Sequence, residues 1–237
     1  MNYQVVVLAA GQGRRMGAGE NKVLLRLDGC PVIIHTLRVF ENDPSCSGIV
    51  LVTQEDEQDQ FRMLVEDYHI TKVRAFADGG KERQESVYLG LSVLTMASDA
   101  IVLIHDGARP FITRKHIAKV TEAAAEHGAA LLAVPVKDTI KKAAGFRVEK
   151  TLERRSLWAA QTPQAFRLSV IREAHRESIE AHFMGTDDVS LVERMGLPVR
   201  IVEGSYRNIK LTTPEDLVIA QLFMEKGGMT NENRSWF

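Results

Sequence analysis

A glycine-rich turn near the amino end of the chain combines flexible backbone with three cationic side chains. Gly11 and Gly13 lack a Cβ atom, so the backbone there can bend sharply and bring its N–H groups close to an anion. Arg14, Arg15 and Lys22 add positive charge beside this turn. These residue types at this spacing indicate the binding of a polyphosphate.

Two better-known phosphate-binding loops have a different spacing. The dinucleotide fingerprint requires G-x-G-x-x-G, but the third glycine, Gly17, comes one residue late, and arginines stand where close helix packing favours small residues. The ATPase loop requires G-K-S or G-K-T, and neither string occurs in the chain. A phosphate loop of a third kind and a plain turn with solvated arginines remain as the two alternatives.

A second pair of glycines, Gly79 and Gly80, stands between a predicted strand and a predicted helix. The free N–H groups at a helix start face the carboxyl edge of a parallel sheet, where α/β proteins bind ligands. Arg83 and Ser86 are three residues apart and therefore share one helical face. The segment fits a nucleotide contact, and it also fits a simple turn followed by a solvated helix.

One carboxylate, Asp106, directly follows a predicted apolar strand over 100–105. Mg²⁺ commonly takes one or two carboxylates and completes its coordination with water and substrate phosphate. Mn²⁺ accepts similar oxygen ligands. Asp106 is therefore the candidate metal ligand, with a turn cap as the alternative. His105 would point to the opposite face of the strand, so the pair makes a poor catalytic dyad.

Strand-like and helix-like segments alternate along the chain, which predicts a Rossmann-like, doubly wound α/β sheet of mostly parallel strands. The apolar run over 5–8 is typical of a central strand buried on both faces. Further strands are expected over 49–53, 72–77, 100–105 and 129–135, and helices over 31–40, 55–68, 81–96 and 114–126, the last capped by Thr113. We expect a single domain over 1–228 and a frayed tail over 229–237.

The segment 136–152 departs from this alternation, because it reads as two polar strands around Gly145 with too few apolar residues to enter the core. A projecting hairpin arm over about 136–156 is expected. An isolated two-stranded hairpin is only marginally stable, so the arm predicts docking on a second subunit in a twofold homodimer. A flexible surface hairpin is the alternative.

Composition narrows the class of protein. The 237 residues are 45% hydrophobic and 26% charged, with a net charge of −1, so nothing suggests a nucleic-acid or membrane surface. The two cysteines, Cys30 and Cys46, fit reduced thiols in a cytoplasm better than a disulfide framework. Residues 1–10 lack the features of a signal peptide, and no apolar run approaches the roughly 20 residues of a membrane helix. We therefore expect a soluble, cytoplasmic protein.

The glycine-rich turn reads L-A-A-G-Q-G-R-R-M-G and is followed by a lysine, which resembles the signature of nucleotidyltransferases that join a sugar or polyol phosphate to a nucleotide. In detail it is similar to the 2-C-methyl-D-erythritol 4-phosphate cytidylyltransferases of the non-mevalonate isoprenoid pathway. The strings D-G-A-R-P, R-R-S-L-W-A-A-Q-T-P-Q and N-I-K-L-T-T-P-E-D extend the resemblance over nearly the whole chain. It implies transfer of CMP from CTP to the polyol phosphate with Mg²⁺.

The resemblance also implies roles for residues that match the family's motifs. Nucleotide contacts are implied for Ala9, Ala10, Gly11, Gly13, Arg15, Lys22, Gly80, Arg83, Ser86, Asp106 and Gly107. Acceptor contacts are implied for Arg109, Thr139, Arg154, Thr162 and Lys210, with the arm reaching the partner's site. Arg15, Lys22, Arg154 and Lys210 would supply the catalytic charges.

Two further segments precede predicted helices. Thr186, in Gly185-Thr186-Asp187-Asp188, fits either a helix cap or a contact to the acceptor phosphate. Pro214-Glu215-Asp216 is a good helix start in its own right and is interpreted as structural.

Two other functions remain open at this point. A ribitol 5-phosphate cytidylyltransferase would share the CTP half of the site and differ in the acceptor pocket. A regulator that senses CTP would bind the nucleotide without turnover, although the presence of Arg15, Lys22 and Asp106 argues against it.

Overall fold

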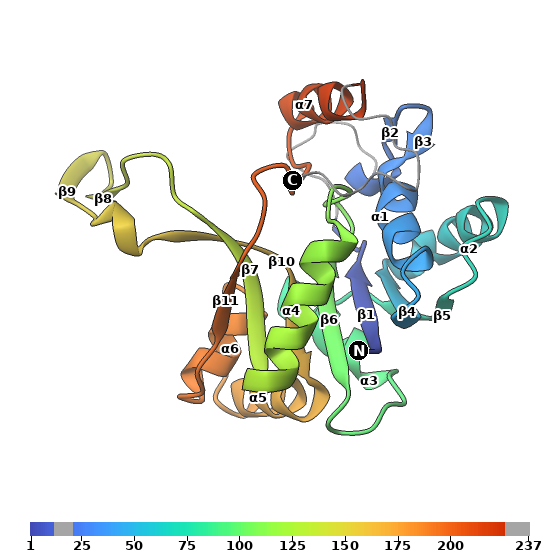
Figure 1. Ribbon diagram of the computed structural model, residues 1–237, viewed down its shortest axis with the longest axis horizontal. Coiled ribbons are helices and arrows are strands. Elements are labelled where there is room, and N and C mark those ends of the chain that lie inside the picture. The colour runs from blue at the N-terminus through green and yellow to red at the C-terminus, as the bar shows by residue number, and fades with distance from the viewer. Residues whose placement is uncertain (12–20, 226–237) are drawn as a thin grey trace.

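The computed structural model describes residues 1–11 and 21–225. Its centre is a seven-stranded sheet in the order β11-β7-β10-β6-β1-β4-β5 (Figure 1). The strands are β1 (Tyr3–Leu8), β4 (Cys46–Thr53), β5 (Val73–Asp78), β6 (Ile101–Asp106), β7 (Ala129–Pro135), β10 (Trp158–Arg167) and β11 (Arg200–Glu203). Two short strands, β2 (Arg26–Leu27) and β3 (Cys30–Pro31), form a separate pair.

Strand β1 lies inside the sheet, between β4 and β6, and runs parallel to both. Only β10 runs against its neighbours, β6 and β7, so the sheet is mostly parallel. Val5, Val6 and Val7 are fully buried because both faces of β1 are covered. The predicted α/β class is confirmed, and β1 is an interior strand buried on both faces, as expected.

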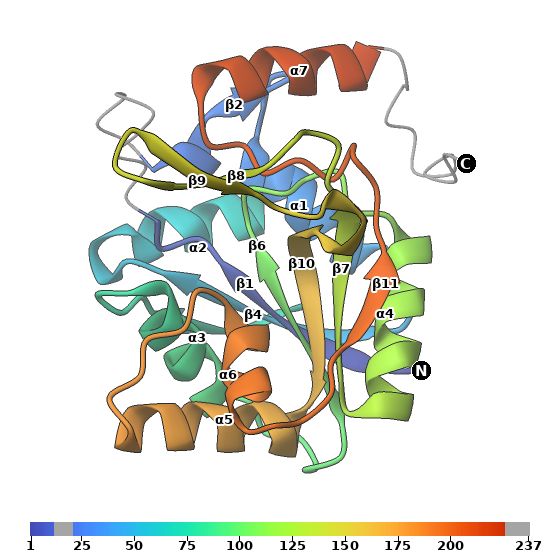
Figure 2. The same cartoon turned by 90° about the vertical axis from the view of Figure 1, so that its left-hand side faces the viewer.

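Helices cover both faces of the sheet (Figure 2). Along β1, Val5 and Val7 pack into the core formed with α1 (Val32–Glu41), α2 (Gln58–Asp67) and α4 (Arg114–His127). Val6 points to the opposite core, formed with α3 (Arg83–Ser92), α5 (Leu168–Glu180) and α6 (Asp188–Arg194). This alternation follows from the two-residue period of a strand. A third, smaller core lies under α7 (Pro214–Glu225).

Two helix predictions need correction. The helix expected over 81–96 begins only at Arg83, because Glu82 has an extended backbone, and ends at Ser92. The helix α6 is capped by Asp187 and not by Thr186: the Asp187 carboxylate accepts a hydrogen bond from the Ser190 N–H at 3.0 Å. By contrast, the Thr113 side chain caps α4 as expected.

The predicted hairpin arm is present and projects from the sheet (Figure 1). Its strands, β8 (Lys141–Ala144) and β9 (Arg147–Thr151), are exposed along their whole length. Tyr206 anchors the base of the arm: its hydroxyl donates to the Pro135 carbonyl at 2.6 Å, and the Lys137 ammonium lies 3.5 Å from its ring centroid. The arm is therefore fixed at its base.

Short 3₁₀ turns complete the structure at Lys22–Leu24, Glu55–Glu57 and Arg154–Ser156. In the described part of the chain, no helix is long and apolar enough to cross a membrane. The expected tail over 229–237 lies outside the described residues.

Candidate active site

A cleft with a volume of 680 Å³ opens at the carboxyl edge of the sheet. It is bordered by the segment after β1, the segment between β5 and α3, and the end of β6. Nine of the residues singled out from the sequence line it together: Ala9, Ala10, Gly11, Lys22, Gly80, Arg83, Ser86, Asp106 and Lys210. The structure thus brings the first three sequence segments to one place.

Strand register explains this convergence. Leu8, the last residue of β1, pairs with Asp106 at the end of β6. Backbone hydrogen bonds continue the sheet past the strand ends, since the Gly107 N–H donates to the Leu8 carbonyl at 2.9 Å and the Gly79 N–H donates to Thr53 at 2.7 Å. Parallel strands end at a common edge, which is where α/β proteins bind ligands.

Asp106 stands at the base of the cleft among three cations. Its Oδ2 lies 2.9 Å from Lys210 Nζ and 3.4 Å from Arg109 Nε, and its Oδ1 lies 3.7 Å from Arg83 Nε. Burial alone would raise the pKa of the Asp106 carboxyl, but Lys210, Arg83 and Arg109 together lower that pKa far below its usual range. Asp106 is therefore a carboxylate at neutral pH, and the net charge of this group is positive.

The segment between β5 and α3 is held in a fixed shape by side chains of α3. The Gly80 N–H donates to Ser86 Oγ at 3.0 Å, and the Lys81 N–H donates to Glu85 Oε2 at 2.7 Å. A Cβ atom at Gly79 would lie 2.3 Å from the Ala10 side chain, so only glycine allows this close approach. Gly79 therefore packs directly against Ala10, at the start of the first glycine-rich turn.

Two amide side chains that the sequence did not single out fix the backbone beside β1. Gln54 Nε2 donates to the Ala10 carbonyl at 2.5 Å, and Asn21 Nδ2 donates to the Ala9 carbonyl at 2.6 Å. Gln54 directly follows β4, so the convergence of strand ends was a usable signal for it. No pattern in the sequence pointed to Asn21, which contacts a carbonyl twelve residues away.

Other predicted residues lie around the cleft or away from it. Arg109 and Thr162 support Asp106 from behind, Thr162 by accepting the Asp106 N–H at 3.0 Å. Gly107 lies behind the cleft, where its N–H is bonded to the end of β1. Thr139 and Arg154 belong to the arm and Thr186 to the exposed loop before α6; none of the three lines this cleft. Gly13 and Arg15 lie outside the described residues.

Metal binding by protein ligands alone has little support in the described residues, where no group of three His, Cys, Asp or Glu side chains could hold an ion. Asp106 and Glu82 are the described carboxylates that line the cleft. A cation held by one or two carboxylates and by substrate phosphates fits this donor set, because Mg²⁺ keeps several non-protein ligands.

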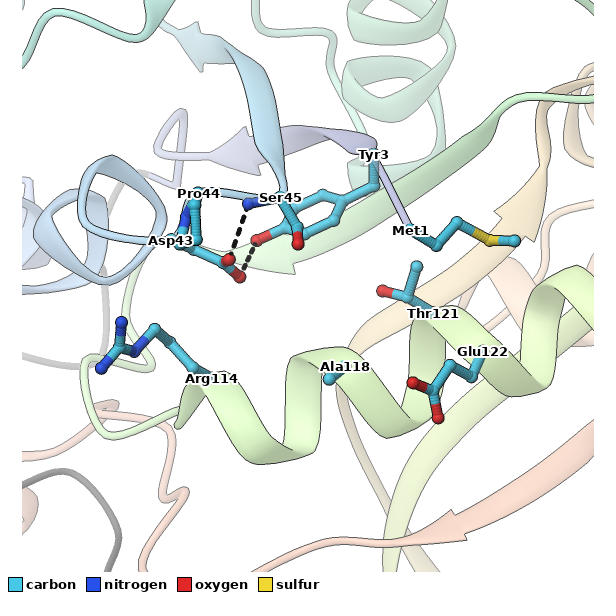
Figure 3. Close-up of a pocket in the computed structure, with 9 residues that line it drawn as sticks. All are labelled: Met1, Tyr3, Asp43, Pro44, Ser45, Arg114, Ala118, Thr121 and Glu122. Carbon is cyan, nitrogen blue, oxygen red and sulfur yellow. Dashed lines mark hydrogen bonds between the residues drawn. The ribbon is translucent and has the colours of Figure 1, made fainter.

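A second cavity, of 260 Å³, lies at the opposite end of β1 (Figure 3). Two hydrogen bonds join polar groups of its wall: the Tyr3 hydroxyl donates to Asp43 Oδ2 at 2.7 Å, and the Ser45 N–H donates to Asp43 Oδ1 at 3.0 Å. These bonds fasten the turn before β4 to the start of β1. We interpret this cavity as structural.

A mostly parallel sheet with glycine-rich segments and a cationic cleft at its carboxyl edge defines a nucleotide-binding α/β protein. A family model described as 2-C-methyl-D-erythritol 4-phosphate cytidylyltransferase matches residues 3–226. The chain belongs to this family of enzymes, as its sequence motifs predicted.

Similar proteins agree with this assignment. A 2-C-methyl-D-erythritol 4-phosphate cytidylyltransferase of Geobacillus thermodenitrificans is 60% identical over 224 residues, covering 94% of this chain and 97% of that protein. The enzyme of the same name from Bacillus velezensis is 57% identical over 226 residues, with coverages of 95% and 97%.

Solved structures show the same fold. The 4-diphosphocytidyl-2C-methyl-D-erythritol synthase of Anaerococcus prevotii has a TM-score of 0.82 at 30% identity, covering 94% of this chain and 96% of that one. The Francisella tularensis cytidylyltransferase has a TM-score of 0.81 at 30% identity, with coverages of 94% and 99%.

Proposed function

We propose that this enzyme transfers CMP from CTP to 2-C-methyl-D-erythritol 4-phosphate, giving 4-diphosphocytidyl-2-C-methyl-D-erythritol and pyrophosphate. The observation that carries the proposal is the cleft in which Asp106 stands among Arg83, Arg109 and Lys210. The acceptor follows from membership of the family and from relatives up to 60% identical that carry this name.

The chemistry asks for charge neutralisation and alignment. A phosphate oxygen of the acceptor attacks the α-phosphorus of CTP, a new P–O bond forms, and the bond to the β-phosphate breaks as pyrophosphate leaves. Both reactants are anions, so the barrier is lowered by cations that hold them together and in line. Lys22 and Arg83 line the CTP side of the cleft in this account, and Lys210 the acceptor side. No protein nucleophile is required.

Mg²⁺, or Mn²⁺ in its place, is the proposed cofactor, with Asp106 as its protein ligand. When bound, the ion would neutralise and orient the phosphates of CTP. The arrangement supports this role because Asp106 is ionised and lines the cleft, and because Mg²⁺ takes few protein carboxylates and completes its coordination with phosphate and water.

We also propose that the enzyme is a homodimer in which each arm completes the partner's acceptor site. Arg154 points back along its own arm, where its Nη1 donates to the Lys137 carbonyl at 2.7 Å, and it lies outside its own cleft. The arm carries Phe146, which is fully exposed, and Val148, which is 57% exposed. Docking on a second copy would bury these apolar side chains and bring Arg154 and Thr139 to the partner's acceptor.

The test is pyrophosphate release by the purified protein with Mg²⁺, CTP and 2-C-methyl-D-erythritol 4-phosphate, repeated without the acceptor, with UTP, and with ribitol 5-phosphate. Release only with CTP and the methylerythritol phosphate is expected. A preference for ribitol 5-phosphate would change the assigned acceptor, and CTP binding without pyrophosphate release under any condition would support a CTP-sensing regulator.

A cytoplasmic location is also proposed, because both cysteines are buried free thiols.

A further inference from the structure

Arg83 joins two buried carboxylates. Its Nη1 lies 2.7 Å from Oδ2 of Asp188, and its Nε lies 3.7 Å from Oδ1 of Asp106. Asp106 belongs to the cleft, whereas Asp188 is the first residue of α6 and is only 1% exposed. The shorter contact is therefore with the carboxylate that lies outside the cleft, and it fixes the direction of the guanidinium.

A histidine of α5 also lies close to Asp188. His175 Nε2 lies 3.6 Å from Asp188 Oδ1, and His175 is fully buried. Burial alone would raise the pKa of the Asp188 carboxyl, but Arg83, together with His175, lowers it, so the group is a carboxylate at neutral pH. A charge buried this deeply is stable only when it is paired, and among the described residues the shortest ion pair of Asp188 is the one with Arg83.

The same face of α5 fixes both ends of the helix that begins with Arg83. Residues 172, 175 and 178 are three apart and so share one helical face. Arg172 donates at 2.9 Å to the carbonyls of Leu91 and Leu94 at the end of α3, and Gln84 near its start donates to Ser178 at 3.0 Å. Helix α5 thus contacts α3 near both of its ends, and the Arg83 side chain lies against Asp188 of α6.

We propose that Asp188 is a positioning residue: it fixes the Arg83 guanidinium at the wall of the cleft, and that guanidinium contacts CTP. This inference rests on the function proposed above. With Asp188 neutralised, the ion pair with Asp106, at 3.7 Å from its Nε, is the one that Arg83 keeps among the described residues. Arg83 would then turn towards Asp106 and away from its place in the cleft. The loss should fall on CTP affinity, because the acceptor side is formed by other residues.

The test measures CTP affinity by calorimetry, which needs no turnover, in the full-length enzyme and in Asp188→Asn. We expect the Kd for CTP to rise about tenfold, the loss typical of removing one member of a buried ion pair without removing the ligand contact itself. The KM for CTP should rise in parallel, and the KM for the acceptor should stay within about twofold. Glu193→Gln, an exposed carboxylate on the same helix, is the matched control and should bind CTP normally.

A double-mutant cycle separates positioning from a general loss of structure. If Asp188 acts through Arg83, then Asp188→Asn should add almost nothing in an Arg83→Gln background. Losses that multiply, or an Asp188→Asn affinity within twofold of the wild type, would overturn the proposal. If Asp188→Asn does not fold, Asp188→Glu enters the same cycle: it keeps the charge, moves it by one methylene, and should raise the Kd about threefold only when Arg83 is present.

Failure of the proposed function would look different. A wild-type enzyme that binds CTP but releases no pyrophosphate would refute the reaction and leave the Asp188 cycle fully measurable. A wild-type enzyme that catalyses the reaction, with Asp188→Asn binding CTP normally, would refute the positioning role alone. No binding of CTP by the wild type would refute both.

Discussion

The ammonium group of Lys210 lies 2.9 Å from Oδ2 of Asp106, and this ion pair ties the segment before α7 to the end of β6. Arg83 and Arg109 approach the same carboxylate from α3 and from the turn after β6. One buried carboxylate thus gathers cations from three parts of the chain. Arg83 and Lys210 line the cleft and can neutralise a phosphate there, while the negative charge of Asp106 offsets the repulsion among the three cations.

Lys210→Met should lower kcat/KM for the acceptor on the order of 100-fold, because one preorganised charge is lost from the transition state. Steady-state kinetics with the acceptor varied at saturating CTP would measure it. Lys119→Met, an exposed lysine on α4, is the control for loss of a positive charge elsewhere. Kinetics equal to the wild type would remove Lys210 from the acceptor site.

Asp106 should make stability depend on pH in the acid range. Its pKa is lowered in the folded state, so its contribution to the free energy of unfolding is present above the unfolded value of about 3.9 and is lost as the pH falls towards the folded value. Asp106→Asn should cost on the order of 3 kcal/mol at pH 7, as expected for breaking a buried ion pair.

Urea unfolding of both proteins at pH 7 and at about pH 3 checks this sign. The difference in free energy of unfolding between the wild type and Asp106→Asn should be smaller at the lower pH. A difference that grows on acidification would mean that the cations around Asp106 do not stabilise its charged form.

Lys22→Ala should lower kcat by about 100-fold or more if Lys22 stabilises charge on the α-phosphate or the leaving group. Lys22 lines the cleft beside Gly11, which supports this assignment. Single-turnover measurement of pyrophosphate formation reports on the chemical step directly. Unchanged turnover would exclude Lys22 from the mechanism.

Much of the fold was predictable because local patterns and strand geometry agree. The apolar run over 5–8 became the central strand, and the strand expected over 129–135 has those bounds in the structure. Residues placed just after strands, such as Gly80 and Asp106, converge because parallel strands end at one edge. This convergence can be predicted from the strand positions alone, and the apolar runs of the sequence indicate those positions.

Residues whose role depends on contacts between distant segments were not predictable in the same way. The sequence indicated Asp188 only as part of a helix start. In the structure this residue of α6 forms an ion pair with Arg83 of α3. Asn21 donates a hydrogen bond to the Ala9 carbonyl, twelve residues away, and no sequence motif links the two positions. The residue type of Thr186 suits a helix N-cap, but α6 begins one residue later than that cap would require, so Asp187 is the N-cap.

If the arm crosses to the partner subunit, as proposed, two impaired variants should complement each other. Lys22→Ala damages the cleft, and Arg154→Ala damages the arm, where it should mainly raise the KM for the acceptor. In a mixed dimer one site would combine an intact cleft with an intact arm. Random mixing makes about half the dimers mixed, each with one working site of two, so about a quarter of wild-type activity should return.

Unfolding and refolding an equal mixture of the two variants, then measuring activity at limiting acceptor, tests this expectation. Each variant refolded alone is the control. Activity no higher than the average of the two variants would mean that each arm serves its own cleft or none.

The most direct test of the central claim is ³¹P nuclear magnetic resonance of the reaction of CTP with 2-C-methyl-D-erythritol 4-phosphate. Signals of both substrates should decrease together while pyrophosphate and the two coupled phosphorus signals of a diphosphate diester appear in equal amounts. Conversion of CTP to CMP and pyrophosphate with the acceptor signal unchanged would show hydrolysis instead of transfer, and would contradict the proposed function.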